Sequence, residues 1–378
     1  MKYLVIVYFI TIIFLGWFSY GFLDPNLSLS SNPIFAYFQS PLSYLVYHNR
    51  SVATAVFFLI VLSLFFSYAC FLRFGEKFFI RWKRLLLVVI ASAMILVFSY
   101  PALTYDLFNY ITTAKVTFTH RENPYLVMPI EIPNEPNLAF TRAANKVALY
   151  GPVWILLTAV GHYLGGGDVW RTIIAFKLMN AAVYLGFCFM IWRLTKKLTN
   201  VIFFAFNPLI VIEILVSGHN DIYMMFFAVI GFICWQKRGL ITKTVGLLSI
   251  FASLLVKGAT LVLIPLLFIK KLSWDRLLLI AYCLLSIAFF AVAPLREELY
   301  PWYAVWLIVV ASFMDFKKQT FITGFSVVLS FALELRHLPY LWMGYYEGPG
   351  PILRTLFTFI PIVFYGGMYI YENRFKES

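Results

Sequence analysis

Charged side chains are scarce in this 378-residue chain: Asp, Glu, Lys and Arg make up 12% of it, and hydrophobic residues make up 62%. A soluble domain carries about 25% charged and about 45–50% apolar residues. The composition therefore excludes a soluble globular protein and predicts an integral membrane protein. The expected fold class is an all-α polytopic membrane protein, because a membrane span must satisfy its own backbone hydrogen bonds.

Cysteine is also scarce, and the four cysteines all lie inside apolar runs. Their spacing matches neither a zinc site nor a disulfide framework. The chain lacks a regular short repeat, a low-complexity tract and a linker that would mark a second domain. The first apolar run, at 3–23, lacks a small-residue cleavage site and is expected to be a retained membrane span. The apolar spans use most of the 378 residues and leave little room for a separate soluble domain.

What the chain has in quantity is apolar runs. About 12–13 of them follow one another, several shorter than the ~20 residues that a perpendicular membrane helix needs. Breaks at Pro208, at Lys257-Gly258 and at Pro265 predict kinked or discontinuous helices at these points.

Lysine and arginine set the expected orientation, because loops rich in them stay in the cytoplasm. With these loops inside, the long polar segment 105–151 and the turn 217–221 both face outward. The net charge of +13 is then a contact surface for anionic membrane lipids. Its spread over short loops argues against nucleic acid as a partner. The basic loops are 73–84, 193–197, 237–238, 270–271 and 317–318, with the C-terminal tail.

One segment breaks the alternation of sides. Runs 152–164, 170–192 and 201–216 cannot all cross the membrane if the segments before and after them face the same side. Either 152–164 is re-entrant or lies along the surface, or 201–216 is the partial span. The sequence leaves both alternatives open.

Two acidic residues at the ends of hydrophobic runs are the strongest functional signal. Asp106 ends one run and Asp221 opens another, both on the expected outer face. Ionisable residues at membrane depth are costly, and by default they are functional. Asp106, Asn109 and Tyr110 are spaced to share one helical face, which suits a general base with hydrogen-bonding neighbours for a sugar or alcohol. Each acid alone is equally well explained as a helix cap or interface anchor.

Cations on the same face are candidates for binding a phosphate. Lys257 interrupts the apolar stretch 240–269 at its outer end, and Arg296 precedes an aromatic group that includes Tyr303. Lysine binds phosphate as a point charge, although a lysine that snorkels to the interface explains Lys257 equally well. His219 is a candidate for a metal or a phosphate, and a structural hydrogen bond is the alternative.

The order and spacing of these motifs resemble the GT-C superfamily of polytopic glycosyltransferases, and most of all the prokaryotic mannosyltransferases that use polyprenyl-phosphate-mannose. Each motif is short, and together they extend over residues 105–305. The stretch after Tyr110 lacks the Arg and the Asp-Gly that the family often has, so the sugar stays open. The matching stretches are Asp106–Tyr110, Asn123-Pro124-Tyr125, Tyr150-Gly151-Pro152, Asn207-Pro208, Ser217–Asp221, Lys257 with Pro265, and Pro301-Trp302-Tyr303.

The resemblance implies inverting transfer of a hexose, in the first place mannose, from a polyprenyl-phosphate carrier to a glycan, glycolipid or protein acceptor. The site would lie on the non-cytoplasmic face of a prokaryotic plasma membrane. The motifs fix no cofactor, and a divalent cation held by Asp106 and Asp221 stays open. The implied roles are catalytic base for Asp106, sugar or acceptor binding for Asn109, Tyr110, Tyr125, His219, Asn220 and Asp221, and lipid-phosphate binding for Lys257, Arg296 and Tyr303.

The expected organisation has three parts. N-terminal transmembrane helices at 1–84 precede a GT-C-like catalytic core at 85–314, whose outer loop 105–151 carries short helices. C-terminal transmembrane helices and a cytoplasmic tail follow at 315–378.

The alternative function is a polytopic transporter or lipid flippase. Such a protein would place charged residues near the membrane midplane. Lys177, Asn180 and Glu213 lie inside apolar runs and keep this alternative open, whereas the other candidate residues cluster at one face.

Overall fold

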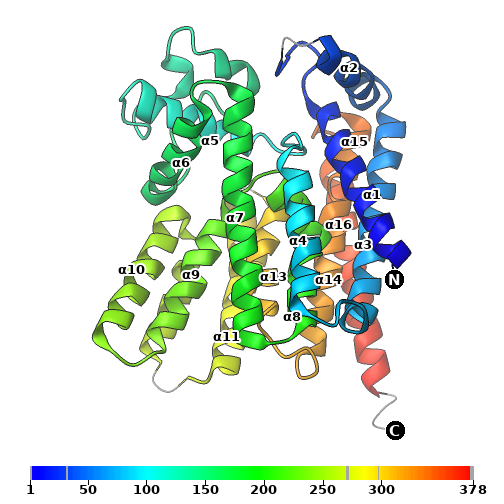
Figure 1. Ribbon diagram of the computed structural model, residues 1–378, viewed down its shortest axis with the longest axis vertical. Coiled ribbons are helices and arrows are strands. Elements are labelled where there is room, and N and C mark those ends of the chain that lie inside the picture. The colour runs from blue at the N-terminus through cyan, green and yellow to red at the C-terminus, as the bar shows by residue number, and fades with distance from the viewer. Residues whose placement is uncertain (1, 31–32, 270–271, 297, 375–378) are drawn as a thin grey trace.

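The computed structural model describes residues 2–30, 33–269, 272–296 and 298–374. These residues form helices and connecting turns, and no strand occurs among them. Figure 1 shows the helices packed as one bundle. We call the end that carries α2, α5 and α15 the upper end, and the end where α7 is followed by α8 the lower end. The expectation of an all-α polytopic membrane protein is confirmed.

The helices follow the apolar runs closely. The α-helices are α1 (Lys2–Phe18), α2 (Pro33–His48), α3 (Arg50–Phe79), α4 (Trp82–Val97), α5 (Asp106–Ala114), α6 (Pro152–Gly165), α7 (Val169–Thr195), α8 (Leu198–Ala205), α9 (Asp221–Trp235), α10 (Leu240–Val256), α11 (Trp274–Ile287), α12 (Ala293–Arg296), α13 (Val305–Ala311), α14 (Thr320–Leu335), α15 (Leu338–Met343) and α16 (Gly350–Arg374). The 3₁₀ and π segments are η1 (Ser19–Phe22), η2 (Lys115–Thr119), η3 (Pro129–Glu131), η4 (Pro136–Phe140), η5 (Ile210–Val216), η6 (Gly258–Phe268), η7 (Ala288–Val292) and η8 (Pro301–Ala304).

Fewer helices than apolar runs have the length of a membrane span. Among the described residues, six helices are long and apolar enough to cross a membrane, and a seventh crossing results if one bent pair is counted as a span. Five further apolar helices have only 10–17 residues. A helix this short does not span the ~30 Å hydrocarbon layer by itself and needs a neighbouring helix to complete the crossing. The break expected at Lys257-Gly258 separates two of them, α10 and η6.

The bent pair is α8 with η5, whose axes meet at 61° just before Pro208. α8 starts beside the end of α3, where Thr199 donates a hydrogen bond to Glu76. η5 ends just beyond α4, where the Ser217 hydroxyl donates to the Ala102 carbonyl at 2.8 Å. Since α3 and α4 run in opposite directions (Figure 1), the bent pair leads from the lower end to the upper end.

The other short run, α6, stays in the upper half of the bundle. Just before it, the Gly151 amide donates to the Val256 carbonyl at the end of α10. Near its other end, His162 lies 3.2 Å from the Thr119 hydroxyl of the outer segment. Figure 1 shows the 14-residue helix beside the upper part of α7. Of the two alternatives that the sequence leaves open, the structure selects 152–164 as the partial span.

Buried polar side chains of α7 hold the broken crossing in place. The Lys177 ammonium donates to the Val216 carbonyl at 2.5 Å and to the Ser99 hydroxyl at 2.7 Å. The Asn180 amide donates to the Ile214 carbonyl at 3.1 Å. Backbone groups inside a membrane need such partners wherever the regular helix ladder is interrupted. These contacts account for the polar residues within α7 without a transport path.

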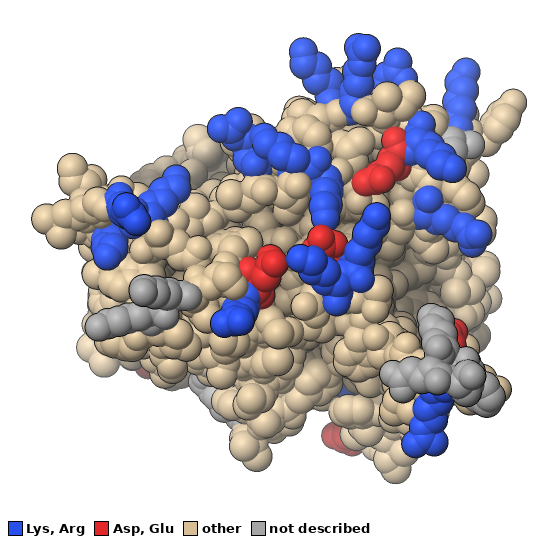
Figure 2. Space-filling model, turned by 90° about the horizontal axis from the view of Figure 1, so that it is seen from below, with Lys and Arg blue, Asp and Glu red and all other residues tan. Residues whose placement is uncertain are grey.

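Basic side chains gather at the lower end. Figure 2 views this end and shows Lys and Arg spread across it, with few acidic side chains among them. The connections found there, from α3 to α4, from α7 to α8 and from α9 to α10, carry the basic loops of the sequence. Asp106 follows the upper end of α4 and so lies away from this basic face.

The close packing between α6 and α10 gives a first prediction. A Cβ on Gly151 would lie 2.1 Å from the Leu255 carbonyl oxygen, so a larger residue must push the two helices apart. We expect Gly151→Ala to destabilise the protein by about 1–3 kcal/mol, seen as a lower Tm of the purified protein in detergent. Gly258→Ala is the matched control, because a Cβ there meets no atom within 4 Å. Equal Tm values for both variants would contradict this packing.

Candidate active site

Asp106 is the first residue of α5, where the chain turns back into the upper end of the bundle. Its backbone amide donates to the Thr104 hydroxyl at 3.1 Å, which fixes the start of the helix. A carboxylate at this position is favoured by the helix dipole. The Asp106 side chain is 27% exposed. It can therefore meet a ligand, as the sequence predicts for a catalytic acid.

Behind Asp106, the imidazole of His219 lies between two carboxylates. Its Nδ1 is 3.3 Å from Oδ2 of Asp106, and its Nε2 is 3.1 Å from Oε2 of Glu213. His219 and Glu213 are fully buried. Neither contact is aligned as a good hydrogen bond, so charge attraction is the main link between the three side chains.

The two carboxylates set the charge of His219. Burial lowers the pKa of the imidazole, but the attraction of Asp106 and Glu213 outweighs it and raises the pKa to about 9. At neutral pH His219 is therefore a cation that joins an exposed acid to a buried one.

Aromatic rings at the start of η8 cover this group. The Trp302 indole stacks on the His219 imidazole with ring centroids 4.0 Å apart, and the Tyr300 ring stacks on Trp302 at 4.4 Å. A cationic ring against an aromatic face is favourable. The stack keeps water from His219 and leaves Asp106 as the exposed end of the three charged groups.

A second charged group surrounds Asp221, the first residue of α9. Both of its carboxylate oxygens accept from the Lys257 ammonium, at 3.0 and 2.9 Å, and Oδ1 also accepts from the Trp306 indole at 2.7 Å. The ammonium lies 4.4 Å from the centroid of the Tyr303 ring. Asp221 is fully buried, whereas the Lys257 side chain is 22% exposed. The arrangement indicates that Asp221 orients Lys257 toward the surface.

Tyr110 and Asn220 connect the two charged groups. The Tyr110 hydroxyl accepts from the Asn220 backbone amide at 3.3 Å, directly between His219 and Asp221 in the chain. The Tyr110 ring packs against Tyr150 at 4.8 Å. Burial raises the pKa of the Tyr110 phenol, so it stays neutral. The side-chain amide of Asn220 is buried without a hydrogen-bond partner in the described part of the chain.

The outer segment packs over α5 through the remaining predicted residues. Asn109 accepts a hydrogen bond from the Thr141 hydroxyl at 2.5 Å. Tyr125 donates to the Tyr150 carbonyl at 2.9 Å, one aromatic ring further out than Tyr110, and its own ring is exposed. Asn109 therefore lies next to the exposed acid in α5, and Tyr125 lies at the rim.

The structure also brings in residues that the sequence did not single out for the site. Arg142 is exposed, with its guanidinium 4.9 Å from the centroid of the Tyr105 ring beside Asp106. In the sequence, Glu213 is marked only as an acid inside an apolar run, and nothing marks Trp306 as a site residue. The predicted Arg296 side chain lies outside the described residues.

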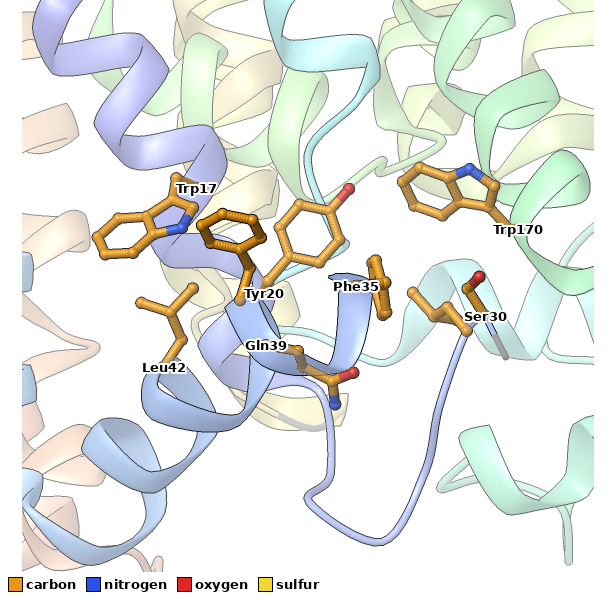
Figure 3. Close-up of a pocket in the computed structure, with 9 residues that line it drawn as sticks. Trp17, Tyr20, Ser30, Phe35, Gln39, Leu42 and Trp170 are labelled. Atoms are coloured by element: carbon orange, nitrogen blue, oxygen red, sulfur yellow. The ribbon is translucent and has the colours of Figure 1, made fainter. Parts of the chain in front are cut away.

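A predominantly apolar pocket lies near the site at the same end of the bundle. Its volume is about 360 Å³. Figure 3 shows it between η1, α2 and the start of α7, with Trp17 and Trp170 in its wall. The ring of Tyr20 in this wall packs on Tyr100, which packs on Phe108 of α5. One layer of aromatic rings thus separates the pocket from the helix that carries Asp106.

Fold and site together define the class of this protein. It is a polytopic membrane protein that has a partly exposed carboxylate, near cations and aromatic rings, where its helices end. Residues 9–272 match the MptA_B family, described as alpha-(1->6)-mannopyranosyltransferase, N-terminal domain. The match covers more than half of the chain, so the chain belongs to this family. This confirms the resemblance to GT-C mannosyltransferases. No curated protein and no solved structure matches the chain.

The outer segment gives a second prediction. Glu135 accepts from Lys115 at 2.7 Å and from the Asn137 amide at 3.0 Å, and it lies 3.4 Å from His120. Burial raises the pKa of Glu135, but these partners outweigh it and lower the pKa. The stabilising effect is therefore present above the ordinary pKa of 4.5 and is lost as the pH falls through the lower folded value.

We expect Glu135→Gln to loosen residues 115–151 at neutral pH, seen as about tenfold faster proteolytic cleavage in this segment, which corresponds to a loss of about 1.4 kcal/mol. Glu122→Gln, at an exposed position of the same segment, is the control. Unchanged cleavage of the Glu135 variant would show that the ion pair does not hold the segment.

Proposed function

We propose that this chain transfers mannose from a polyprenyl-phosphate carrier to a hydroxyl group of a glycan, glycolipid or protein. Its family already makes glycosyl transfer of mannose the class of activity. The lipid-phosphate donor, the inversion and the outer membrane face are our additions. The observation that carries them is Asp106, a partly exposed acid held by a buried cationic histidine at the upper end of the bundle.

Asp106 is the proposed base. Its carboxylate takes the proton of the acceptor hydroxyl, whose oxygen attacks the anomeric carbon of mannose from the side opposite the phosphate. The bond between that carbon and the phosphate oxygen breaks, and the phosphate leaves with the electron pair. One displacement of this kind inverts the configuration. His219 and Glu213 hold the Asp106 carboxylate in place for this step.

The second requirement is a cation beside the leaving phosphate, which stabilises the negative charge that develops as the bond breaks. Lys257 is the first candidate, because its partly exposed ammonium uses Asp221 for orientation and has a third N–H to donate. Arg142 supplies a further exposed cation against the ring of Tyr105, the residue that precedes Asp106. Tyr303, whose ring lies against the Lys257 ammonium, and Arg296 complete the proposed phosphate-binding set.

Exposure divides the proposed sugar-binding residues into two groups. Asn109 and Tyr125 reach the surface and are proposed to contact the sugar or the acceptor. The others are buried and are proposed to position the contacting groups rather than to touch the substrate; they are Tyr110, His219, Asn220 and Asp221. A divalent cation shared by Asp106 and Asp221 is disfavoured, because both oxygens of Asp221 already have partners.

The proposed membrane side follows from charge. The basic side chains gather at the lower end (Figure 2), and such loops stay in the cytoplasm. Asp106 lies at the other end, which favours the non-cytoplasmic face. The apolar pocket at the upper end (Figure 3) suits part of a lipid chain whose headgroup reaches the site.

The decisive experiment gives the purified protein polyprenyl-phosphate-[¹⁴C]mannose and an extract of envelope acceptors. We expect transfer, and we expect Asp106→Asn to lower kcat by about 100-fold or more, while Glu122→Gln keeps normal transfer. Near-normal turnover of Asp106→Asn would reject Asp106 as the base. Transfer from a nucleotide-linked mannose, with none from the lipid donor, would reject the proposed donor.

A double variant tests the role of Lys257. Lys257→Met leaves the buried Asp221 carboxylate unpaired, which destabilises a protein by about 3–5 kcal/mol. We expect Asp221→Asn combined with Lys257→Met to recover most of the Tm, because neither side chain is then charged. Transfer should stay low and the KM for the lipid donor high. If the double variant recovers transfer as well as Tm, Lys257 is a structural partner only.

A further inference from the structure

Three side chains converge beneath the candidate active site, and the proposed reaction gives them no common role. Glu213 comes from η5, Glu334 from the end of α14, and His337 from the turn before α15. One ligand atom of each, a carboxylate oxygen or an imidazole nitrogen, lies within 4.8 Å of the other two. Both glutamates are fully buried, and the His337 side chain is 14% exposed.

Glu334 is the unexplained member of this cluster. Both of its carboxylate oxygens are buried without a hydrogen-bond partner among the residues that the structure describes. The neighbouring Arg336 is directed elsewhere, since it donates to Glu298 and to Thr358. A buried carboxylate without a partner is costly. Its position next to a second carboxylate, that of Glu213, calls for positive charge between them.

The other two side chains fit the same requirement. Glu213 uses Oε2 toward His219, while Oε1 lies 3.1 Å from Nε2 of His337. His337 thus presents an imidazole nitrogen to the space that the carboxylates share. Two oxygen ligands and one nitrogen ligand, all drawn from buried or nearly buried side chains, form the start of a metal coordination sphere.

We propose that Glu213, Glu334 and His337 bind one divalent transition-metal ion, of the class of Mn²⁺ or Zn²⁺. Mixed carboxylate and imidazole ligands suit these ions, whereas Ca²⁺ takes six to eight oxygen ligands. Bonds of about 2.0–2.2 Å place two ligand atoms at most about 4.4 Å apart. A small rotation of the side chains closes the cluster to that size, and water completes the coordination.

The ion has a positioning role rather than a direct contact with substrate. It ties η5 to α14 and α15, which come together from more than a hundred residues apart in the chain. Glu213 would bind the ion with one carboxylate oxygen and contact His219 with the other. Fixing Glu213 therefore also fixes the His219 imidazole, which lies behind Asp106. This site differs from the pair Asp106 and Asp221 that the motifs suggested for a cation.

The test measures metal binding without donor or acceptor, so its outcome is independent of the proposed reaction. Purified protein in detergent is stripped with a chelator and titrated separately with Mn²⁺, Zn²⁺, Mg²⁺ and Ca²⁺. Bound metal is counted by mass spectrometry and by Mn²⁺ electron paramagnetic resonance, and Tm is measured at each step. We expect one Mn²⁺ or Zn²⁺ per chain and a higher Tm on binding, with smaller effects of Mg²⁺ and Ca²⁺.

Glu334→Gln keeps the shape of the side chain and removes its charge, and we expect it to lower metal affinity at least tenfold and to lose the metal-dependent rise in Tm. Glu76→Gln, at the end of α3, is the matched control and should bind as the unchanged protein does. If Glu334→Gln does not fold, His337→Gln at the partly exposed ligand gives the same comparison.

Two results would overturn the proposal. In the first, the protein binds none of the four ions and shows no rise in Tm, which means that a proton rather than an ion neutralises Glu334. In the second, metal binding is as tight in Glu334→Gln and His337→Gln as in the unchanged protein, which puts the ion elsewhere.

Discussion

The contact of His219 with Asp106 on one side and Glu213 on the other is the interaction on which the site depends. It holds a buried cation between two acids, and it lets an exposed carboxylate keep one orientation. An unpaired histidine cation at this depth would be costly, and so would an unpaired Glu213. Each charge is tolerated because the others are present. The site is therefore one electrostatic unit rather than a set of separate residues.

This unit requires a membrane crossing that is not a continuous helix. In a regular helix through residues 198–221, Glu213 and His219 would belong to one continuous series of backbone hydrogen bonds. Such a helix would also have no turn at Gly218, whose φ is +90°. The bend before Pro208 and the π-helical η5 free backbone carbonyls, and Lys177 and Asn180 satisfy them. Polar residues deep in the bundle thus stabilise the break that creates the site.

Much of this could be predicted from the sequence, because it rests on local composition and spacing. Low charge and long apolar runs determine the all-α membrane class, and Pro208 and Lys257 determine where helices break. Motif order identifies the family. Hydropathy predicts that Asp221 opens a helix, as the structure has it, whereas it puts Asp106 at the end of an apolar run and the structure has it as the first residue of α5. These features depend on residues within one or two turns of each other.

Tertiary structure alone decided the partners of these residues. That Lys257 pairs with Asp221, that Glu213 meets His219 and His337, and that 152–164 is the partial span all follow from how helices pack. Glu213 and His337 are 124 positions apart, and nothing in local spacing connects them. An apolar run shows that a helix is buried, but only packing shows which polar side chains face each other across the bundle. The sequence by itself thus determined the kind of protein and its exposed acid, and the packing decided what holds that acid in place.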